Sequence, residues 1–483
     1  MRDLLNVIEE RTRTWNALSR QTLADEVWAD YVSIRFRRTG DPRALQYLYP
    51  YLNHADRSTR LEAISVAGRV FEGRGLASLN HLDYFTKNTD QFIRDRAALV
   101  VGAAMTGSRD DAILSTLAPY LSHRSQFIRK LALRALGKAA MGLASEAVLR
   151  ELLRVAKMPG PRPDEAQMAI ARAFSGRPTE ETYSLVARRE LVGYIDTGNT
   201  EAVAELIRGA SDEWYERACR EIFEPCLLIR ETKERWMLPF VHRDGVQALG
   251  RAAPRRGMEA LRRVLHLRGG RIPGYAMLRA AQEFFAGADV ERNRGPLIEL
   301  ARTGDIHGQR VAAVCLGRLV IGLEDAETIG VLRQLCEARS KAVQSSALVG
   351  LGMAAKSTCD ENLRRLCLER SGDRETAVAA LRGLGMVFLG SGRGELFQEV
   401  RREADRRRAE PVRNRHHSRP LYACYETTGR IYLGTGSTEP LEFLLDVLAL
   451  PHNRQMGAYQ LAAAKALNMI EFPESALDPA YYL

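Results

Sequence analysis

Long apolar runs are missing from this 483-residue sequence. Its longest apolar stretch, residues 97–105, is far shorter than the roughly 18 residues that a membrane-spanning helix needs. The sequence is charged from Arg2 onward and opens with no apolar segment, unlike a secretory signal. We therefore expect no insertion into a membrane.

Cysteine is scarce as well. The seven cysteines are odd in number and no two have the C-x-x-C spacing, so neither a disulfide framework nor a zinc module is indicated. Most of them lie in Ala- and Leu-rich helical patterns, where cysteine serves as a small core residue. The reducing cytoplasm is the expected location.

Signatures of catalysis are also absent from the sequence. None of the nine histidines precedes a glutamate, and there is no H-E-x-x-H, G-x-S-x-G or Walker motif. The adjacent His416 and His417 point apart and have no evident third ligand to complete a metal site. We predict no catalytic residue, no metal and no cofactor, and a function that is not enzymatic.

Aromatic residues make up only 7% of the chain, whereas Ala, Leu, Arg and Gly dominate, which favours helices over sheets. A chain of 483 residues exceeds one compact core, so it forms either several domains or an elongated repeat array. The 70 Lys and Arg outnumber the 60 Asp and Glu, and only eight of those cations are Lys. A GC-rich genome produces this Arg bias as readily as nucleic-acid binding does.

An internal repeat of about 35 residues runs through the sequence. It is marked by six glycines, the repeat glycines: Gly68, Gly102, Gly137, Gly317, Gly352 and Gly385. Alanine stands five positions before each of them: Ala63, Ala97, Ala132, Ala312, Ala347 and Ala380. Asp or Ser stands twelve positions before: Asp56, Asp90, Ser125, Asp305, Ser340 and Asp373.

This pattern is typical of a helix–turn–helix unit. The Asp or Ser can accept hydrogen bonds from the free N–H groups of a first helical turn, and apolar residues then recur at spacings of three and four. The alanine permits close approach of two helices, and the glycine suits a close crossing or a C-terminal cap. A shorter amphipathic helix precedes each unit, as over residues 42–52, 111–121 and 326–336. Such units must stack on their neighbours to bury their apolar faces.

Residues 125–139 (SQFIRKLALRALGKA) and 306–320 (IHGQRVAAVCLGRLV) resemble HEAT repeats, most closely the short bacterial type named after phycobilisome lyases. The N-terminal Asp or Ser, the Ala and the terminal Leu-Gly carry the match. The resemblance implies an all-α, right-handed α-solenoid of about eleven or twelve stacked two-helix HEAT-like repeats. It is nearly silent on function, because scaffolds, adaptors and a few enzymes share this repeat.

The repeat register divides the chain into five segments. An N-terminal helical cap is expected over residues 1–41 and HEAT-like repeats over 42–212. An irregular, aromatic-rich segment follows over 213–250, repeats resume over 251–471, and residues 472–483 form a C-terminal tail.

The aromatic-rich segment has two interpretations. Its aromatic residues are Trp214, Tyr215, Phe223, Trp236 and Phe240. They form either a surface for a ligand or partner or a locally enlarged core, and the enlarged core is favoured.

Two basic segments hold the excess charge of the chain. Residues 251–271 carry a net +6 and residues 401–419 a net +5, compared with +10 for the whole sequence. Because arginine binds phosphate and carboxylate well, they are a candidate partner surface, although solvated helix ends give the same pattern. The candidate partner-binding residues, which we expect to be exposed, are Arg255, Arg256, Arg262, Arg263, Arg401, Arg402, Arg406, Arg407 and Arg408.

The leading hypothesis is a non-enzymatic scaffold or adaptor. In this hypothesis a protein partner binds along the inner surface of the solenoid and the two Arg segments. An acidic partner would suit the arginines of these segments. The alternatives are a nucleic-acid-binding HEAT protein, which the lack of a known motif disfavours, and an enzyme resembling bilin lyases. The repeated Arg60, Arg94 and Arg129 are predicted to be structural, each pairing with an acid or carbonyl of a neighbouring unit.

Overall fold

The computed structural model describes residues 36–74, 90–158, 163–187, 197–224, 246–266, 274–409, 415–448 and 456–471, apart from residues 37, 54 and 56. Within these ranges the regular structure is helical throughout, without strands. The chain divides into two compact units, one formed by Phe36–Ala286 and one containing Gly287–Leu483. Most of the predicted N-terminal cap, residues 225–245 and the predicted tail lie outside the described residues.

The Phe36–Ala286 unit consists of helix pairs. Its first helices are α4 (Arg43–Leu52), α8 (Asp110–Leu121), α10 (Glu146–Ala156), α12 (Glu180–Ala187), α14 (Asp212–Ala218) and α17 (Met258–His266). Its second helices are α5 (Arg57–Val70), α7 (Gln91–Ala104), α9 (Gln126–Ala139), α11 (Pro163–Ala173), α13 (Thr197–Leu206) and α18 (Gly274–Phe285). The π-helix η3 (Cys219–Phe223) extends α14 directly.

The Gly287–Leu483 unit has the same construction. Its first helices are α19 (Val290–Thr303), α21 (Ala326–Cys336), α23 (Glu361–Ser371), α25 (Gly394–Ala409) and α27 (Leu441–Leu448). Its second helices are α20 (Ile306–Leu319), α22 (Lys341–Ala354), α24 (Ala377–Val387), α26 (Arg415–Ile431) and α28 (Met456–Glu471). The predicted all-α solenoid of stacked helix pairs is confirmed, and α4, α8 and α21 match the predicted first helices to within a residue at each end.

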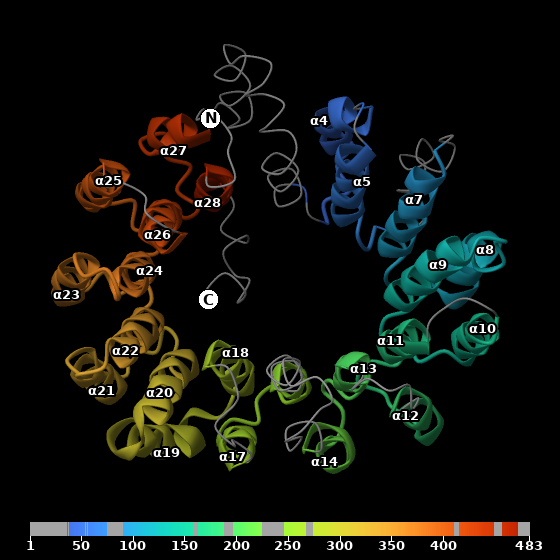
Figure 1. Cartoon of the computed structure of the whole chain (residues 1–483), viewed down its shortest axis with the longest axis horizontal. Helices are drawn as coiled ribbons and strands as arrows, with labels where there is room; N and C mark the ends of the chain where they lie inside the picture. Colours follow the sequence, from blue (N-terminus) through green and yellow to red (C-terminus); the bar gives the residue numbers. More distant parts are fainter. Residues whose placement is uncertain are drawn as a thin grey trace. The chain divides into compact units, whose positions relative to one another are not determined.

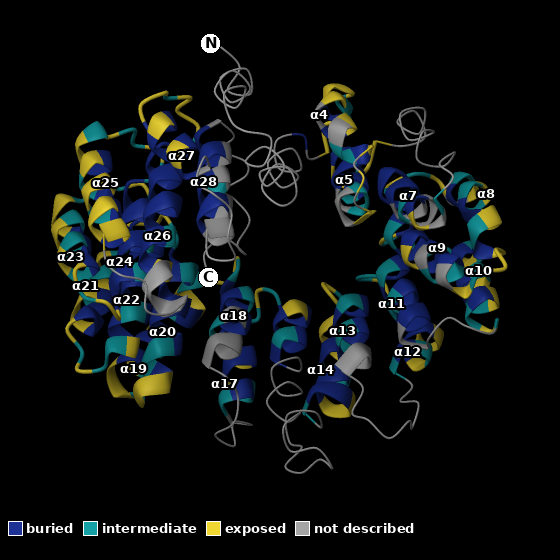
Figure 2. Ribbon diagram, turned by 45° about the horizontal axis from the view of Figure 1, so that its top comes forward, coloured by how far each residue is buried: buried dark blue, intermediate teal, exposed yellow. Residues whose placement is uncertain are grey.

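In each unit taken by itself, the helices form two rows (Figure 1). Consecutive second helices pack on one another and line the concave side, while the first helices lie outside them. Buried residues follow both rows, and exposed residues concentrate on the outer helices (Figure 2). The core therefore runs along each row of pairs instead of gathering at one centre.

The repeat glycines lie where consecutive second helices cross. A Cβ atom on Gly102 would lie 2.6 Å from the Cβ of Ala135, and one on Gly317 would lie 2.2 Å from the carbonyl oxygen of Gly350. All six repeated alanines, from Ala63 to Ala380, are buried. Of the two roles predicted for the glycine, close crossing is therefore the one that the structure shows.

The turn after each second helix is a separate device. Five residues after the repeat glycine, the backbone adopts positive φ, as at Gly142, Ser357 and Gly390. At four of the six positions the N–H group donates to a late carbonyl of the next second helix, for example Gly142 to Arg172 at 3.0 Å and Gly390 to Arg430 at 2.8 Å. Main-chain hydrogen bonds therefore connect successive repeats.

The predicted N-caps are confirmed at two of the positions. The Asp90 carboxylate accepts from the Phe92 N–H and the Asp305 carboxylate from the Gly308 N–H. Ser125 and Ser340 occupy the N-cap without a side-chain hydrogen bond to the helix.

Asp373 is an exception to the N-cap pattern. The prediction for it is wrong, because α24 begins at Ala377 with Thr376 as its N-cap. The Asp373 carboxylate instead accepts from the Glu375 N–H in the preceding turn, at 2.9 Å.

The repeated arginines are structural. Arg60 donates to the Asp90 carboxylate, 3.2 Å away at the start of the next second helix. Arg129 donates to the carbonyls of His123 and Arg124, in the turn before its own helix. The side chain of Arg94 lies outside the described residues.

We predict that Gly317→Ala destabilises the protein by roughly 1–3 kcal/mol, because the new methyl group meets the Gly350 backbone and the helices must separate. The matched control is Gly330→Ala in α21, where a Cβ meets no atom within 4 Å. There alanine adds helix propensity worth about 0.5–1 kcal/mol. Chemical unfolding of both variants measures the difference, and equal midpoints would contradict the crossing.

Stability is expected to depend on pH through carboxylates at helix starts. Burial opposes ionisation of Asp325, but its hydrogen bonds from Thr328 and the guanidinium of Arg294 hold its pKa below the usual value. A lowered carboxyl pKa adds stability above the unfolded-state pKa of about 4, and that stability is lost as pH falls through the folded-state pKa. Asp325→Asn should therefore lower the unfolding free energy at pH 7 and change it little at pH 3. A deficit that is the same at both pH values would count against the ion pair.

Candidate binding groove on the inner helices

A groove of about 530 Å³ lies along five consecutive second helices of the Phe36–Ala286 unit, α5, α7, α9, α11 and α13. Small residues at the helix crossings, Gly68, Ala103 and Ala169, line it together with the apolar Val100 and Met168. Five cations also line it: Arg69, Arg96, Arg134, Lys138 and Arg172. Only two acids, Glu165 and Glu201, do so.

Some of these charges are already paired. Arg134 donates to Oε1 of Glu165 at 3.1 Å, and Lys130 also pairs with that oxygen. Lys138 lies 3.1 Å from Glu72. Burial opposes ionisation of Glu72, but the Lys138 and Arg38 cations hold the pKa of this carboxyl below its usual value. These pairs fix the middle of the groove through contacts between neighbouring repeats.

Three polar groups in the groove have no partner in the described part of the chain. The guanidinium groups of Arg96 and Arg172, on α7 and α11, are half-buried and make no ion pair. Glu165 is about 94% buried, with 6% of its surface exposed, and its Oε2 accepts no hydrogen bond. A buried acceptor without a donor costs free energy comparable to a lost hydrogen bond. The groove therefore offers two unpaired cations and one unpaired acceptor to a ligand.

None of the nine candidate site residues of the sequence analysis lines this groove. Arg69 and Lys138 each directly follow a repeat glycine, and Arg172 is equivalent to Lys138 because Gly142 and Gly176 occupy equivalent turns. The signal was present as one recurring cationic position. Net charge per segment concealed it, because these cations are spread over four helices instead of following one another in the sequence.

The first basic segment lies on an outer helix. Arg262 on α17 and Arg255, in the turn before it, are exposed, and Arg255 has a φ of 70°. Arg256 donates to Asp212 at 2.6 Å and lies over the Tyr215 ring at 3.9 Å. Arg263 makes two hydrogen bonds to the Glu216 carboxylate, at 3.0 and 3.1 Å. Of the four candidate arginines in this segment, two are therefore exposed and two tie α17 and the turn before it to α14.

The second basic segment covers the end of α25 and the start of α26, and its candidate arginines all lie on α25. Arg401 and Arg402 are exposed, and Arg406 is exposed but pairs with Glu403. Arg407 is buried, donating to Glu403 and to the Ser371 carbonyl at 2.8 Å each. Arg408 donates to the Tyr425 hydroxyl at 3.0 Å.

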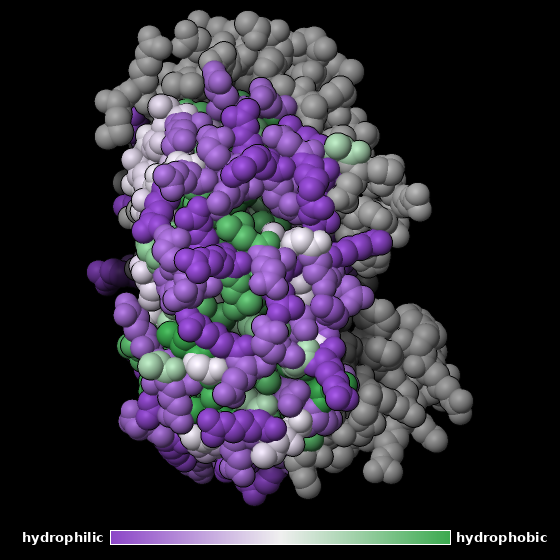
Figure 3. All heavy atoms as spheres, turned by 90° about the vertical axis from the view of Figure 1, so that its left-hand side faces the viewer, coloured by the Kyte–Doolittle hydropathy of each residue, from purple (hydrophilic) through white to green (hydrophobic). Residues whose placement is uncertain are grey.

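Two expectations for these segments are corrected. Arg256, Arg263 and Arg407 are not exposed charges, because contacts with neighbouring helices leave their side chains only 16%, 23% and 6% exposed. The nine candidate arginines also do not lie on the inner surface, since they belong to the first helices α17 and α25 and to the turn before α17. The outer face of the Gly287–Leu483 unit is largely hydrophilic, with apolar side chains between the polar ones (Figure 3).

The described aromatic residues of the 213–250 segment belong to the core. Tyr215 and Phe223 are buried, and the half-buried Trp214 packs on Tyr183 at 5.2 Å. Trp236 and Phe240 lie outside the described residues.

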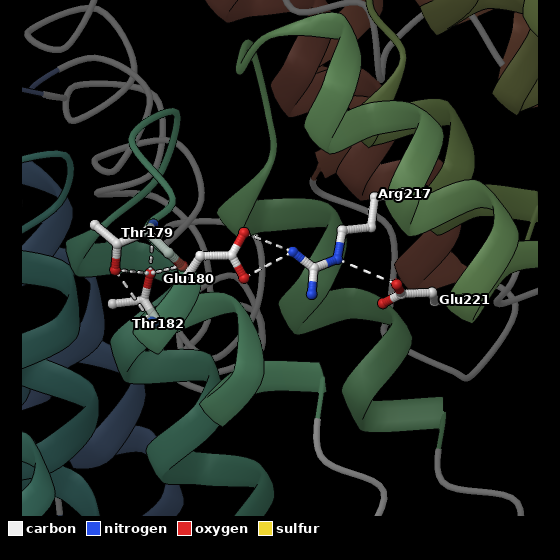
Figure 4. A network of polar contacts seen from close by, with 5 residues as sticks. All are labelled: Thr179, Glu180, Thr182, Arg217 and Glu221. Carbon is white, nitrogen blue, oxygen red and sulfur yellow. Dashed lines mark hydrogen bonds and ion pairs between the residues drawn. The ribbon is translucent and has the colours of Figure 1, made fainter.

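A polar network borders this aromatic core (Figure 4). Arg217 bridges Glu180, at the start of α12, and Glu221 in η3, at 2.8 and 3.1 Å. Its guanidinium also lies over the Tyr183 ring at 4.5 Å. Thr179 and Thr182 cap the start of α12 through reciprocal side-chain to backbone hydrogen bonds. The network joins neighbouring repeats.

The described cysteines behave as core residues. All six are free, and five of them, Cys219, Cys315, Cys336, Cys367 and Cys424, are buried. Burial raises the pKa of the Cys336 and Cys367 thiols to about 12. Among the described residues no three potential metal ligands converge, and no helix has the length and apolar character to span a membrane.

The neighbouring Arg262 and Arg263 provide a direct test of which basic residues are structural. Arg263→Ala should destabilise the protein by about 1 kcal/mol, because it removes a half-buried guanidinium that pairs with Glu216 and Glu224 and lies over the Tyr215 ring. Arg262→Ala, which removes an exposed side chain, should stay within about 0.5 kcal/mol of the parent. Thermal unfolding measures both, and equal effects would show that the Glu216 pair contributes nothing.

No family model and no curated protein matches the sequence. Among solved structures, the chain is similar to the complex of CpcE and CpcF of phycocyanin lyase from Nostoc sp. PCC7120, with 13% identity, a TM-score of 0.33, and coverage of 57% of this chain and 93% of that one. It is also similar to importin beta, with 13% identity and a TM-score of 0.38, covering 89% of this chain and 65% of that one. The structure of Kap121p bound to Pho4p is 11% identical with a TM-score of 0.39, and the match covers 99% of this chain and 54% of that one. The chain thus spans only half to two thirds of the length of these last two proteins.

The likeness concerns the fold alone, and the HEAT-like architecture predicted from the repeat is confirmed by the helix pairs themselves.

Proposed function

We propose that this chain is a non-enzymatic scaffold or adaptor, and that its Phe36–Ala286 unit binds a protein partner along the inner row of helices. The observation that carries the proposal is the groove, in which Arg96, Arg172 and Oε2 of Glu165 all have no partner within the described residues. Unpaired polar groups in a half-buried groove favour a ligand that supplies the missing partners. Stacked helix pairs also present a long surface, which suits a macromolecule.

The groove supports binding better than the two basic segments do. Four of the nine candidate arginines, Arg256, Arg263, Arg407 and Arg408, contact acids, rings or hydroxyls of neighbouring helices. The exposed Arg255, Arg262, Arg401 and Arg402 can add long-range attraction for an acidic partner, an effect that salt screens. The cytoplasm, a reducing compartment, suits the buried free thiols.

Reversing the free groove charges should remove the partner. We expect the Arg96→Glu, Arg172→Glu double variant to co-purify at least tenfold less of the principal partner from the source cells, by quantitative mass spectrometry. The matched control is Arg150→Glu with Arg177→Glu, which changes the net charge equally at exposed positions outside the groove. Equal capture by the two double variants would refute the groove as the binding surface.

A further inference from the structure

The unpaired groups of the groove specify the chemistry of its ligand. A carboxylate is the natural partner for each free guanidinium, since the two form charge-assisted, bidentate hydrogen bonds. Oε2 of Glu165 needs a donor, because its other oxygen is already held by Lys130 and Arg134. A ligand that fits must carry two anionic groups with an N–H donor between them. A peptide backbone with acidic side chains has this composition.

The spacing of the helices sets the scale for the separation of the two acids. Arg96 lies on α7 and Arg172 on α11, with α9 between them. Packed helices lie about 8–10 Å apart, so the two cations belong to helices separated by roughly 16–20 Å. An extended chain advances about 3.3 Å per residue and alternates its side chains, so an even spacing is needed for two acids on one face. A spacing of six residues between the two acids satisfies both requirements, because it spans about 20 Å and is even.

The remaining lining agrees with such a peptide. Val100 and Met168 offer apolar contacts to the side chains that lie between the two acids on the same face. Nucleic acid fits less well, because Glu165 and Glu201 would repel a continuous row of phosphates and no aromatic side chain is among the described lining residues for bases to stack on.

We infer that the groove binds an extended peptide segment of a partner, with two acidic residues six positions apart and apolar residues between them on the same face. The inference rests on the proposed function and adds the identity of the recognised segment. One acid pairs with Arg96 and the other with Arg172, while a backbone N–H of the segment donates to Oε2 of Glu165.

The test uses two synthetic peptides of identical composition and the full chain. The first, Gly-Asp-Thr-Leu-Thr-Leu-Thr-Asp-Gly, has acids six apart; the second, Gly-Thr-Leu-Asp-Thr-Asp-Leu-Thr-Gly, has them two apart. Both carry blocked ends and a fluorescent label, and anisotropy gives Kd. We expect the first to bind at least tenfold more tightly and to lose at least tenfold in affinity to the Arg96→Glu, Arg172→Glu variant. The Arg150→Glu, Arg177→Glu control should leave its affinity unchanged.

A backbone readout tests the role of Glu165 separately. Methylation of the three central backbone nitrogens of the first peptide (Leu, Thr and Leu), one at a time, should weaken binding at least fivefold at one position, because a methylated amide has no N–H to donate. Equal binding of all three methylated peptides would overturn the Glu165 contact.

The remaining outcomes separate the inference from the proposed function. Equal affinity for the two peptides would overturn the six-residue spacing. Tighter binding of a random-sequence DNA duplex, lost in the Arg96→Glu, Arg172→Glu variant, would replace the peptide by nucleic acid. If neither peptide binds while partner capture still depends on the groove, the inference fails and the scaffold function stands. If capture ignores the groove, the function itself fails.

Discussion

Close approach of consecutive second helices is the constraint on which the structure depends. At Gly102, Gly317 and Gly352 the next helix lies so near that even one methyl group meets its atoms below 3 Å. Dense packing of this kind leaves no room for adjustment, so the small residues determine which faces of the helices meet. The positions of all other side chains on these helices follow from that choice.

The groove is a consequence of these crossings. Where the helices nearly touch, small residues line the bottom, and the longer side chains one turn away rise on either side. Lys138 follows Gly137 directly, and Arg134 precedes it by three positions, so both extend from the crossing into the groove. The same geometry that stabilises the stack therefore brings cations from four consecutive second helices together. In this protein, the residues that pack the helices and the cations that line the groove occupy adjacent positions of one repeat.

The sequence was sufficient for the fold and insufficient for the site, and the reason is physical. A repeat specifies its crossing through residues that recur, such as Ala132 and Ala347, and recurrence is visible in the sequence. Charge pairing has no such signature: Arg263 and Arg262 are neighbours of the same type, yet only Arg263 faces the acids of α14. Asp373 likewise has the right residue type at the right offset, but its helix begins four residues later. Periodicity predicts which helices exist, whereas the partner of an individual side chain depends on tertiary neighbours.

The left-handed turns give each unit a direction. Every bonded turn donates its N–H groups forward, as Gly390 and Gly392 do to Arg430 and Ile431, and each second helix supplies only acceptors to the repeat before it. Removing the following repeat leaves the N–H groups of these turns facing solvent, whereas removing the preceding repeat leaves carbonyl groups facing solvent. The two ends of such an array are therefore chemically unequal, because one presents main-chain donors and the other presents main-chain acceptors.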